Sequence, residues 1–188
     1  MKNIQLSSSY LKCLGGFTLT ELMITISVAA ILASTAVPSF SDMIKRNRVI
    51  TQQNDLLGDI MLARIEAIKR GYSVSICSAN LAATGCSGSK IDWHQGWLIY
   101  VNSDKHGVYD SNDGDELLRI HDPFVSSTRL DYTYTTLTFN SRGFMSGSDV
   151  NARFAFCNTN DEVDYEREIK MLSTGRASRR EATASTCI

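Results

Sequence analysis

One carboxylate stands at the edge of a long uncharged segment. From Leu22 to Ser41 the sequence contains no Asp, Glu, Lys or Arg, and Glu21 comes directly before this segment. About 20 apolar residues in helical conformation are enough to cross the hydrocarbon core of a bilayer. A carboxylate at such a boundary is costly to bury without a cation, so Glu21 either pairs with a positive group or turns toward the polar interface.

A glycine–aromatic sequence just ahead of Glu21 offers such a positive group. Small glycines let extended backbone enter a protease cleft, and cleavage between Gly16 and Phe17 would create an α-amine close to the carboxylate. Pairing of Glu21 with the amine of a neighbouring copy would give assembly a register. The alternative is a secretory signal cut near Ala36. A secretory signal, however, carries basic residues where Glu21 stands, and here the helical pattern continues beyond the apolar run.

Gly15, Gly16, Phe17 and Glu21, followed by the apolar run, resemble the processing site of type IV prepilins and type II secretion pseudopilins. The resemblance implies that a prepilin peptidase cuts between Gly16 and Phe17 and that Phe17 is then N-methylated. Pro38 stands where such proteins often carry a helix-kinking proline. The implied partners are other major and minor pilins or pseudopilins. The implied location is the bacterial inner membrane before assembly, and the periplasm or a cell-surface pilus afterwards.

The helical pattern predicts one helix over residues 17–70, with its membrane part at about 17–41. Beyond Pro38, apolar residues recur at three- and four-residue steps as far as Ile68, with charged residues between them. Lys69 and Arg70 followed by Gly71 are typical of the end of a helix. We therefore expect residues 1–16 to be a leader and the second half of the helix to pack on a domain.

Residues 71–188 have the patterns of a β-rich domain, which the resemblance to prepilins implies to be periplasmic or extracellular. Alternating or apolar runs of strand length are separated by Gly and Asn turn residues, and they predict strands at 73–78, 96–101, 116–121, 130–139, 153–157 and 167–172. The predicted fold class is α+β, with a long N-terminal transmembrane and amphipathic helix packed on antiparallel sheet, as in pilins.

Four stretches of this second part are similar to the FimU, FimT and GspH group of minor pilins and pseudopilins. They are 47–49, 63–71, 93–97 and 139–144. The similarity implies a subunit that helps to prime or cap assembly of a type IV pilus or type II secretion pseudopilus. The alternative within the same group is a DNA-binding minor pilin of a competence pilus. No nucleophile elbow, phosphate loop or zinc-protease helix is present, so we expect no enzyme and no cofactor.

The cysteines indicate export to an oxidising compartment. Cys13 would leave with the leader, and the remaining four allow three pairings. Proximity in the sequence favours Cys77–Cys86, which leaves Cys157–Cys187 to hold the tail. The histidines are scattered and no C-x-x-C pair occurs, so no metal site is expected. The acidic stretch 104–116 misses the spacing of a calcium-binding loop and favours a solvated turn. Trp93 and Trp97 favour core positions over a ligand platform.

The C-terminal tail is a local basic segment in a weakly acidic chain. Its cations are Lys170, Arg176, Arg179 and Arg180, whereas the formal net charge is −1 and would become −3 without the two leader lysines. The Gly175–Arg180 stretch is similar to the Gly-Arg-x-Arg element through which FimT-type pilins bind DNA, although its second arginine comes one place late. In an extended strand Arg179 would point away from the other two arginines. Two interpretations stay open, double-stranded DNA binding and a solvated or subunit-facing charge cluster.

Overall fold

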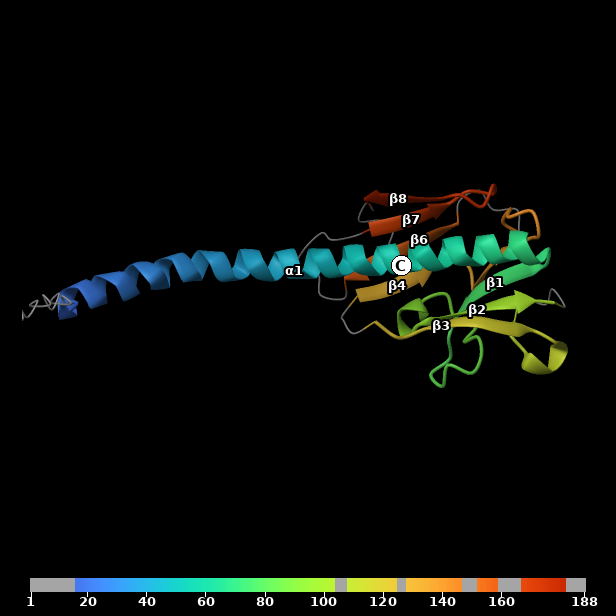
Figure 1. Cartoon of the computed structure of the whole chain (residues 1–188), viewed down its shortest axis with the longest axis horizontal. Helices are drawn as coiled ribbons and strands as arrows, with labels where there is room; N and C mark the ends of the chain where they lie inside the picture. Colours follow the sequence, from blue (N-terminus) through green and yellow to red (C-terminus); the bar gives the residue numbers. More distant parts are fainter. Residues whose placement is uncertain (1–15, 104–107, 125–127, 147–151, 159–166, 182–188) are drawn as a thin grey trace, which may run out of the picture. The chain divides into compact units, whose positions relative to one another are not determined.

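The computed structural model of the chain divides into two compact units, Met1–Met43 and Ile44–Ile188. It describes residues 16–103, 108–124, 128–146, 152–158 and 167–181 (Figure 1). Gly15, Asp104 and Cys187, which the sequence singled out, lie outside these ranges.

One helix, α1, runs from Leu19 to Arg70, close to the predicted bounds. Thr18 precedes it, and its hydroxyl accepts a hydrogen bond from the Glu21 N–H at 3.2 Å. At the other end Gly71 adopts φ +73°, a left-handed conformation that suits glycine and ends the helix. Pro38 lies inside α1, and its side chain is outside the described part. Of the helices in the described ranges, none is both long and apolar enough to cross a membrane.

The described residues of the second unit form two antiparallel four-stranded sheets. The first has the order β3-β2-β1-β5, with β1 at Ser73–Ser78, β2 at Trp97–Asn102, β3 at Glu116–His121 and β5 at Thr136–Phe139. The second has the order β4-β6-β7-β8, with β4 at Thr128–Tyr132, β6 at Arg153–Asn158, β7 at Arg167–Met171 and β8 at Ala177–Glu181. Two short 3-10 helices, η1 at Trp93–Gln95 and η2 at Ser111–Asp113, lie in the connections.

The single strand predicted at 130–139 is two strands in different sheets. The chain bends over residues 133–135, so that β4 joins the second sheet and β5 joins the first. These three residues include no Gly or Pro, and the sequence therefore carries no turn signal. The bend is set by tertiary packing, because Leu130 and Tyr132 on one side of it and Leu137 and Phe139 on the other are all buried in one core.

That core lies between the second half of α1 and both sheets (Figure 1). The helix contributes Leu56, Ile60, Ala63 and Ala67, each at most 1% exposed. Trp93 and Trp97 are fully buried. Buried apolar area of this kind is the main stabilising term of a small domain.

Two polar groups of α1 attach the helix to the sheets. Asp59 is 2% exposed and accepts hydrogen bonds from Trp97 Nε1 and Arg119 Nη1, both at 2.9 Å. Arg64 donates from Nε to the Gly143 carbonyl at 3.0 Å and from Nη2 to the Thr174 carbonyl at 3.2 Å. These hydrogen bonds, together with the buried apolar side chains, fix the position of the second half of α1 on the strands.

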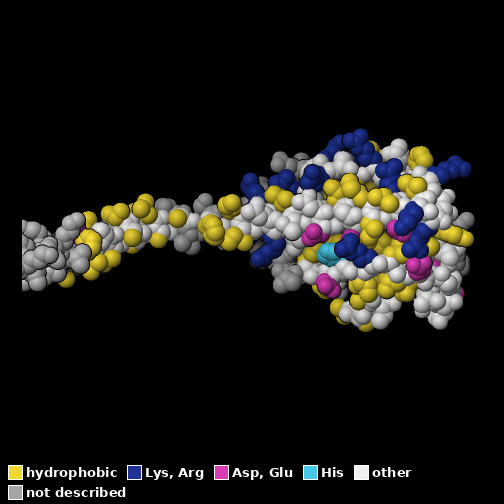
Figure 2. Space-filling model, viewed as in Figure 1, with side chains coloured by type: hydrophobic (Ala, Val, Ile, Leu, Met, Phe, Trp, Pro, Cys, Tyr) yellow, Lys and Arg dark blue, Asp and Glu magenta, His cyan; other side chains and the backbone are white. Residues whose placement is uncertain are grey.

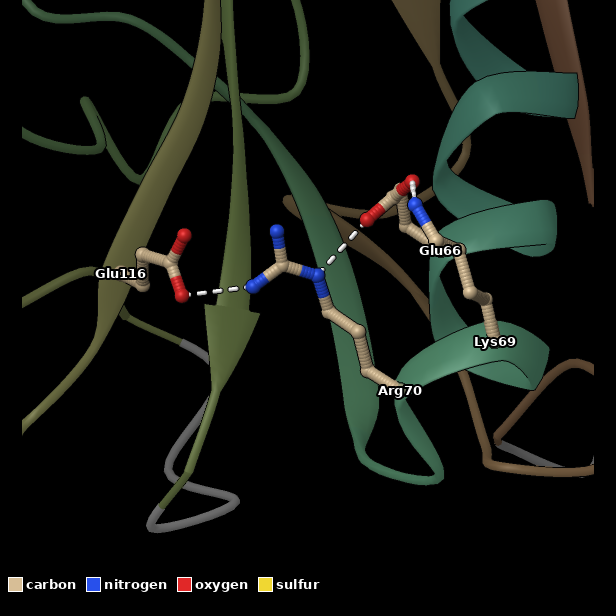
Figure 3. Close-up of polar contacts among 4 residues, drawn as sticks. All are labelled: Glu66, Lys69, Arg70 and Glu116. Atoms are coloured by element: carbon tan, nitrogen blue, oxygen red, sulfur yellow. Dashed lines mark hydrogen bonds and ion pairs between the residues drawn. The ribbon is translucent and has the colours of Figure 1, made fainter.

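An ionic network joins the end of α1 to the start of β3 (Figure 3). Arg70 bonds Glu66 through Nε and Glu116 through Nη1, both at 2.6 Å, and Lys69 lies 3.3 Å from Glu66. Hydrogen bonds from Arg70 and then Lys69 lower the pKa of Glu66, and the two carboxylates raise the pKa of Arg70. The network is at the surface, so we expect it to orient the last helical turn and to add little stability.

Candidate functional site

The residues predicted at the processing site are exposed ahead of α1. Phe17 is 84% exposed, and a side chain added at Gly16 would meet no atom within 4 Å. The bond between these two residues therefore lies in an open segment before the helix begins. Gly15 is outside the described ranges.

Glu21 occupies a position whose structural role the sequence interpretation missed. Thr18 is the N-cap of α1, and Glu21 is the third residue of the helix, whose N–H bonds the Thr18 hydroxyl. The T-x-x-E spacing of these residues is that of a capping box, in which the acid side chain also favours the helix N-terminus. This signal was readable from the sequence. Glu21 consequently has two candidate roles, capping its own helix and pairing with an α-amine.

The helix of the first unit exposes apolar side chains along its length. Its exposed large apolar residues, each more than half exposed, are Leu19, Leu22, Met23, Ile24, Ile26, Val28, Ile31, Leu32, Phe40 and Met43. A helix with apolar residues all round is stable only when an apolar environment surrounds it. This surface is therefore suited to burial among other helices or in lipid.

The structure contains a disulfide between Cys77 and Cys86, whose Cα atoms are 5.6 Å apart. It joins the end of β1 to the following loop, and Cys77 packs there with Leu98 and Tyr100 in a small second cluster. Cys157 is also disulfide-bonded and is buried in β6. Its predicted partner, Cys187, lies outside the described residues.

The tail cations separate onto two sides of the second sheet. Arg179 donates from Nη1 to Asn54 Oδ1 of α1 at 2.7 Å, and its neighbour across the strands is the buried Ile169. Arg180, which points the other way, lies opposite Glu168, and Arg176 sits exposed in the turn before β8. Arg179 therefore belongs to the helix contact and not to a ligand site. This split agrees with strand alternation, although β8 itself was not among the predicted strands.

The outer side of this sheet contains a cation that sequence reasoning missed. Arg153 of β6 pairs directly with Lys170 of β7, which in turn pairs with Ser178 of β8. Like charges at directly opposed positions destabilise a sheet. We call Arg153, Lys170, Arg176 and Arg180 the basic face. No sequence signal marks Arg153, because its neighbours depend on strand register.

The acidic stretch forms a turn that uses part of its carboxylates internally. Asp115 is buried and accepts hydrogen bonds from the N–H groups of Ser103 and Asp110. Asp110 accepts from the Asn112 N–H at 2.8 Å at the start of η2. The described residues contain no group of three His, Cys, Asp or Glu that could hold a metal ion. Asp104, at the start of the stretch, is outside these ranges.

Comparison with known structures supports the fold. The crystal structure of the type IV minor pilin FimU from Pseudomonas aeruginosa is 20% identical, with a TM-score of 0.53 over 76% of this chain and 93% of that chain. A second crystal form of the same protein is 21% identical, with a TM-score of 0.49 over 68% of this chain and 88% of that one. Among curated proteins no sequence matches.

Two family models match the chain itself. The prokaryotic N-terminal methylation motif matches residues 13–37, which include the predicted cleavage site and the start of α1. The model of the type II transport protein GspH matches residues 52–175, about two thirds of the sequence. The chain therefore belongs to the GspH family, and it is a minor pilin or pseudopilin of a type IV pilus or type II secretion system.

Proposed function

We propose that the chain is a structural subunit that helps to prime or cap assembly of its fibre. A prepilin peptidase would remove residues 1–16, and residues 17–41 would hold the subunit in the inner membrane until assembly. The helix of the first unit would then pack among other subunits, while the second unit docks on its neighbours. No catalytic step is assigned to the chain.

The observation that carries this proposal is the arrangement at the start of α1, inside the methylation motif. Cleavage before Phe17 would leave a new amine one residue ahead of the N-cap Thr18, with Glu21 in the first turn. In an apolar environment a carboxylate is costly unless a cation neutralises it. The α-amine of a neighbouring subunit supplies that cation and would fix the axial position of one helix against the next.

Two variants separate this role of Glu21 from helix capping. Glu21→Gln removes the charge and keeps a side chain that can complete a capping box. Thr18→Ala removes the capping hydroxyl and keeps the charge. We expect both proteins to be cleaved, and only Glu21→Gln to be lost from the fibre fraction relative to the membrane fraction, measured by quantitative immunoblot in the native host.

If Glu21 acts only as a helix cap, Glu21→Gln should remain in the fibre fraction. If Glu21→Gln enters fibres like wild type, charge pairing between subunits is wrong. Mass spectrometry of the wild-type protein checks the processing step, and it should find N-methyl-phenylalanine from Phe17 at the terminus. An N-terminus near Ala36 would contradict the pilin processing.

The comparisons give no support to the DNA-binding alternative, which stays a prediction. The geometry also removes Arg179 from the proposed site, since that side chain bonds Asn54. Three of the four predicted cations, Lys170, Arg176 and Arg180, remain together on one face.

A further inference from the structure

A short loop after β1 is held in shape by the disulfide at its base. Residues 79–86 form this loop, which we call the closed loop, and the Cys77–Cys86 disulfide closes it. Inside it, Asn80 Oδ1 accepts a hydrogen bond from the Thr84 N–H at 3.0 Å, and Asn80 Nδ2 donates to Thr84 Oγ1 at 3.2 Å. The loop therefore holds its shape within the free subunit.

The closed loop presents one large apolar side chain to solvent. Leu81 is 93% exposed, the highest value among the large apolar side chains of the described residues. Two residues later Ala83 has φ +53°, and in the described part of the chain no other residue with a side chain has a positive φ. An exposed leucine is ordinary by itself, but a strained backbone angle persists only where the surrounding structure enforces it. The loop thus keeps Leu81 in this exposed position.

The closed loop lies on the face of the first sheet that is turned away from α1. Alternate residues of a strand point to opposite faces. Ile76 belongs to the core shared with the helix, whereas Cys77 packs with Leu98 and Tyr100 in the second cluster on the other face. The loop follows directly, and Figure 1 shows it as the green segment below β3. A molecule that covers Leu81 is therefore different from a helix that packs along α1.

The composition of the closed loop limits the class of its partner. Residues 71–89 contain no Asp, Glu, Lys or Arg, and Figure 2 shows Lys and Arg side chains gathered along the β7–β8 side of the unit. DNA and anionic lipid surfaces are bound through cations. The Asn80 amide, which could otherwise bind a sugar hydroxyl, is already bonded to Thr84. The chemistry that fits Leu81 is an apolar, uncharged pocket on a protein.

We propose that Leu81 is an anchor residue, which inserts into an apolar pocket on the globular domain of a different pilin or pseudopilin subunit. The inference rests on the proposed function, because a subunit that primes or caps a fibre stands next to other subunits. It deepens that function by naming the side chain that selects the neighbour. A loop already held in its bound shape loses little conformational entropy on docking, so burial of one leucine contributes most of its transfer free energy to affinity.

The test places photoreactive benzoylphenylalanine at position 81 of the full chain in the native host. After irradiation, the cross-linked products are purified in detergent and identified by mass spectrometry. We expect one major adduct, with another protein that carries a prepilin methylation motif. The matched control carries the same probe at position 172, where Leu172 is a partly exposed leucine in the turn after β7, and should not give this adduct.

Substitutions then measure the contributions of the side chain and of the loop shape. Leu81→Ala should lower the amount of that partner co-purified with the tagged chain by about tenfold, because the buried leucine side chain is lost. Leu172→Ala is the matched control and should leave the amount unchanged. Asn80→Ala keeps Leu81 and removes both side-chain hydrogen bonds to Thr84, so it should lower the amount by about threefold. Circular dichroism should show that every variant is folded.

Four results would overturn the proposal. They are no adduct from position 81, an adduct with a second copy of this chain, an adduct with lipid or with a protein that lacks the methylation motif, and co-purification that Leu81→Ala leaves unchanged. The proposed function is tested separately, because it fails if the wild-type chain is absent from the fibre fraction. A chain that enters fibres and gives no adduct from position 81 refutes the anchor alone.

Discussion

Replacing Asp59 by Ala should destabilise the second unit by about 2–4 kcal/mol. Asp59 is the acceptor for the indole N–H of Trp97, which is fully buried, and for the half-exposed Arg119. Leaving a buried donor without a partner costs about 1–3 kcal/mol. Loss of an ion pair whose cation side chain is 55% exposed adds about 1 kcal/mol or less.

Asp59→Asn separates the two contributions. The amide oxygen can still accept from Trp97, so this variant should lose only about 1 kcal/mol. Asp55→Ala, one turn earlier on α1 and exposed, is the matched control and should change stability by less than about 0.5 kcal/mol.

Urea denaturation of residues 44–188, followed by tryptophan fluorescence and circular dichroism, measures these differences. This unit contains every buried residue of the described part, so it holds the core intact. Equal losses for Asp59→Ala and Asp59→Asn would refute the reasoning, because the stranded indole N–H would then carry no cost.

Three other predictions concern the same unit. Gly175→Ala should lose more than about 3 kcal/mol in the same assay, because φ is +76° and the added carbon would overlap the carbonyl oxygen of Gly143. Gly58→Ala, in an open helical position, should instead gain about 0.5–1 kcal/mol. Arg70→Met should raise the pKa of Glu66 toward 4.5 in a carbon-detected NMR titration, and the stability that Glu66 contributes, present above its unfolded-state pKa, should fade as pH drops through its lowered folded-state pKa. Removing the Cys77–Cys86 disulfide should cost about 2–3 kcal/mol for so short a loop, and thiol titration of the oxidised wild type should find neither cysteine free.

Signals carried by neighbouring residues in the chain were sufficient for the helix. The apolar run, the three- and four-residue periodicity and the glycine stop at Gly71 predicted α1 to within two residues at its start and none at its end. The Cys77–Cys86 disulfide forms between cysteines close in sequence. Each of these features depends on local spacing, which the sequence displays directly.

Features that depend on strand register were beyond such reasoning. β8 reads Ala-Ser-Arg-Arg-Glu, without apolar alternation, and is a strand because it pairs with β7 at the edge of the sheet. The proximity of Arg153 to Lys170 follows from the β6–β7 pairing alone. The bend at 133–135 has β-branched and aromatic residues that favour strand, and packing of its two flanks in one core overrides that preference.

The double attachment of Arg64 has a mechanical consequence for a fibre subunit. Gly143 lies in the turn after β5 of the first sheet, and Thr174 lies in the β7–β8 turn of the second. Tension that enters the unit through α1 is therefore passed to both sheets at one residue, Arg64. Neither sheet can slide along the helix without breaking its own hydrogen bond to Arg64. A lysine at position 64 has a single ammonium in place of the planar fork and would load one sheet alone.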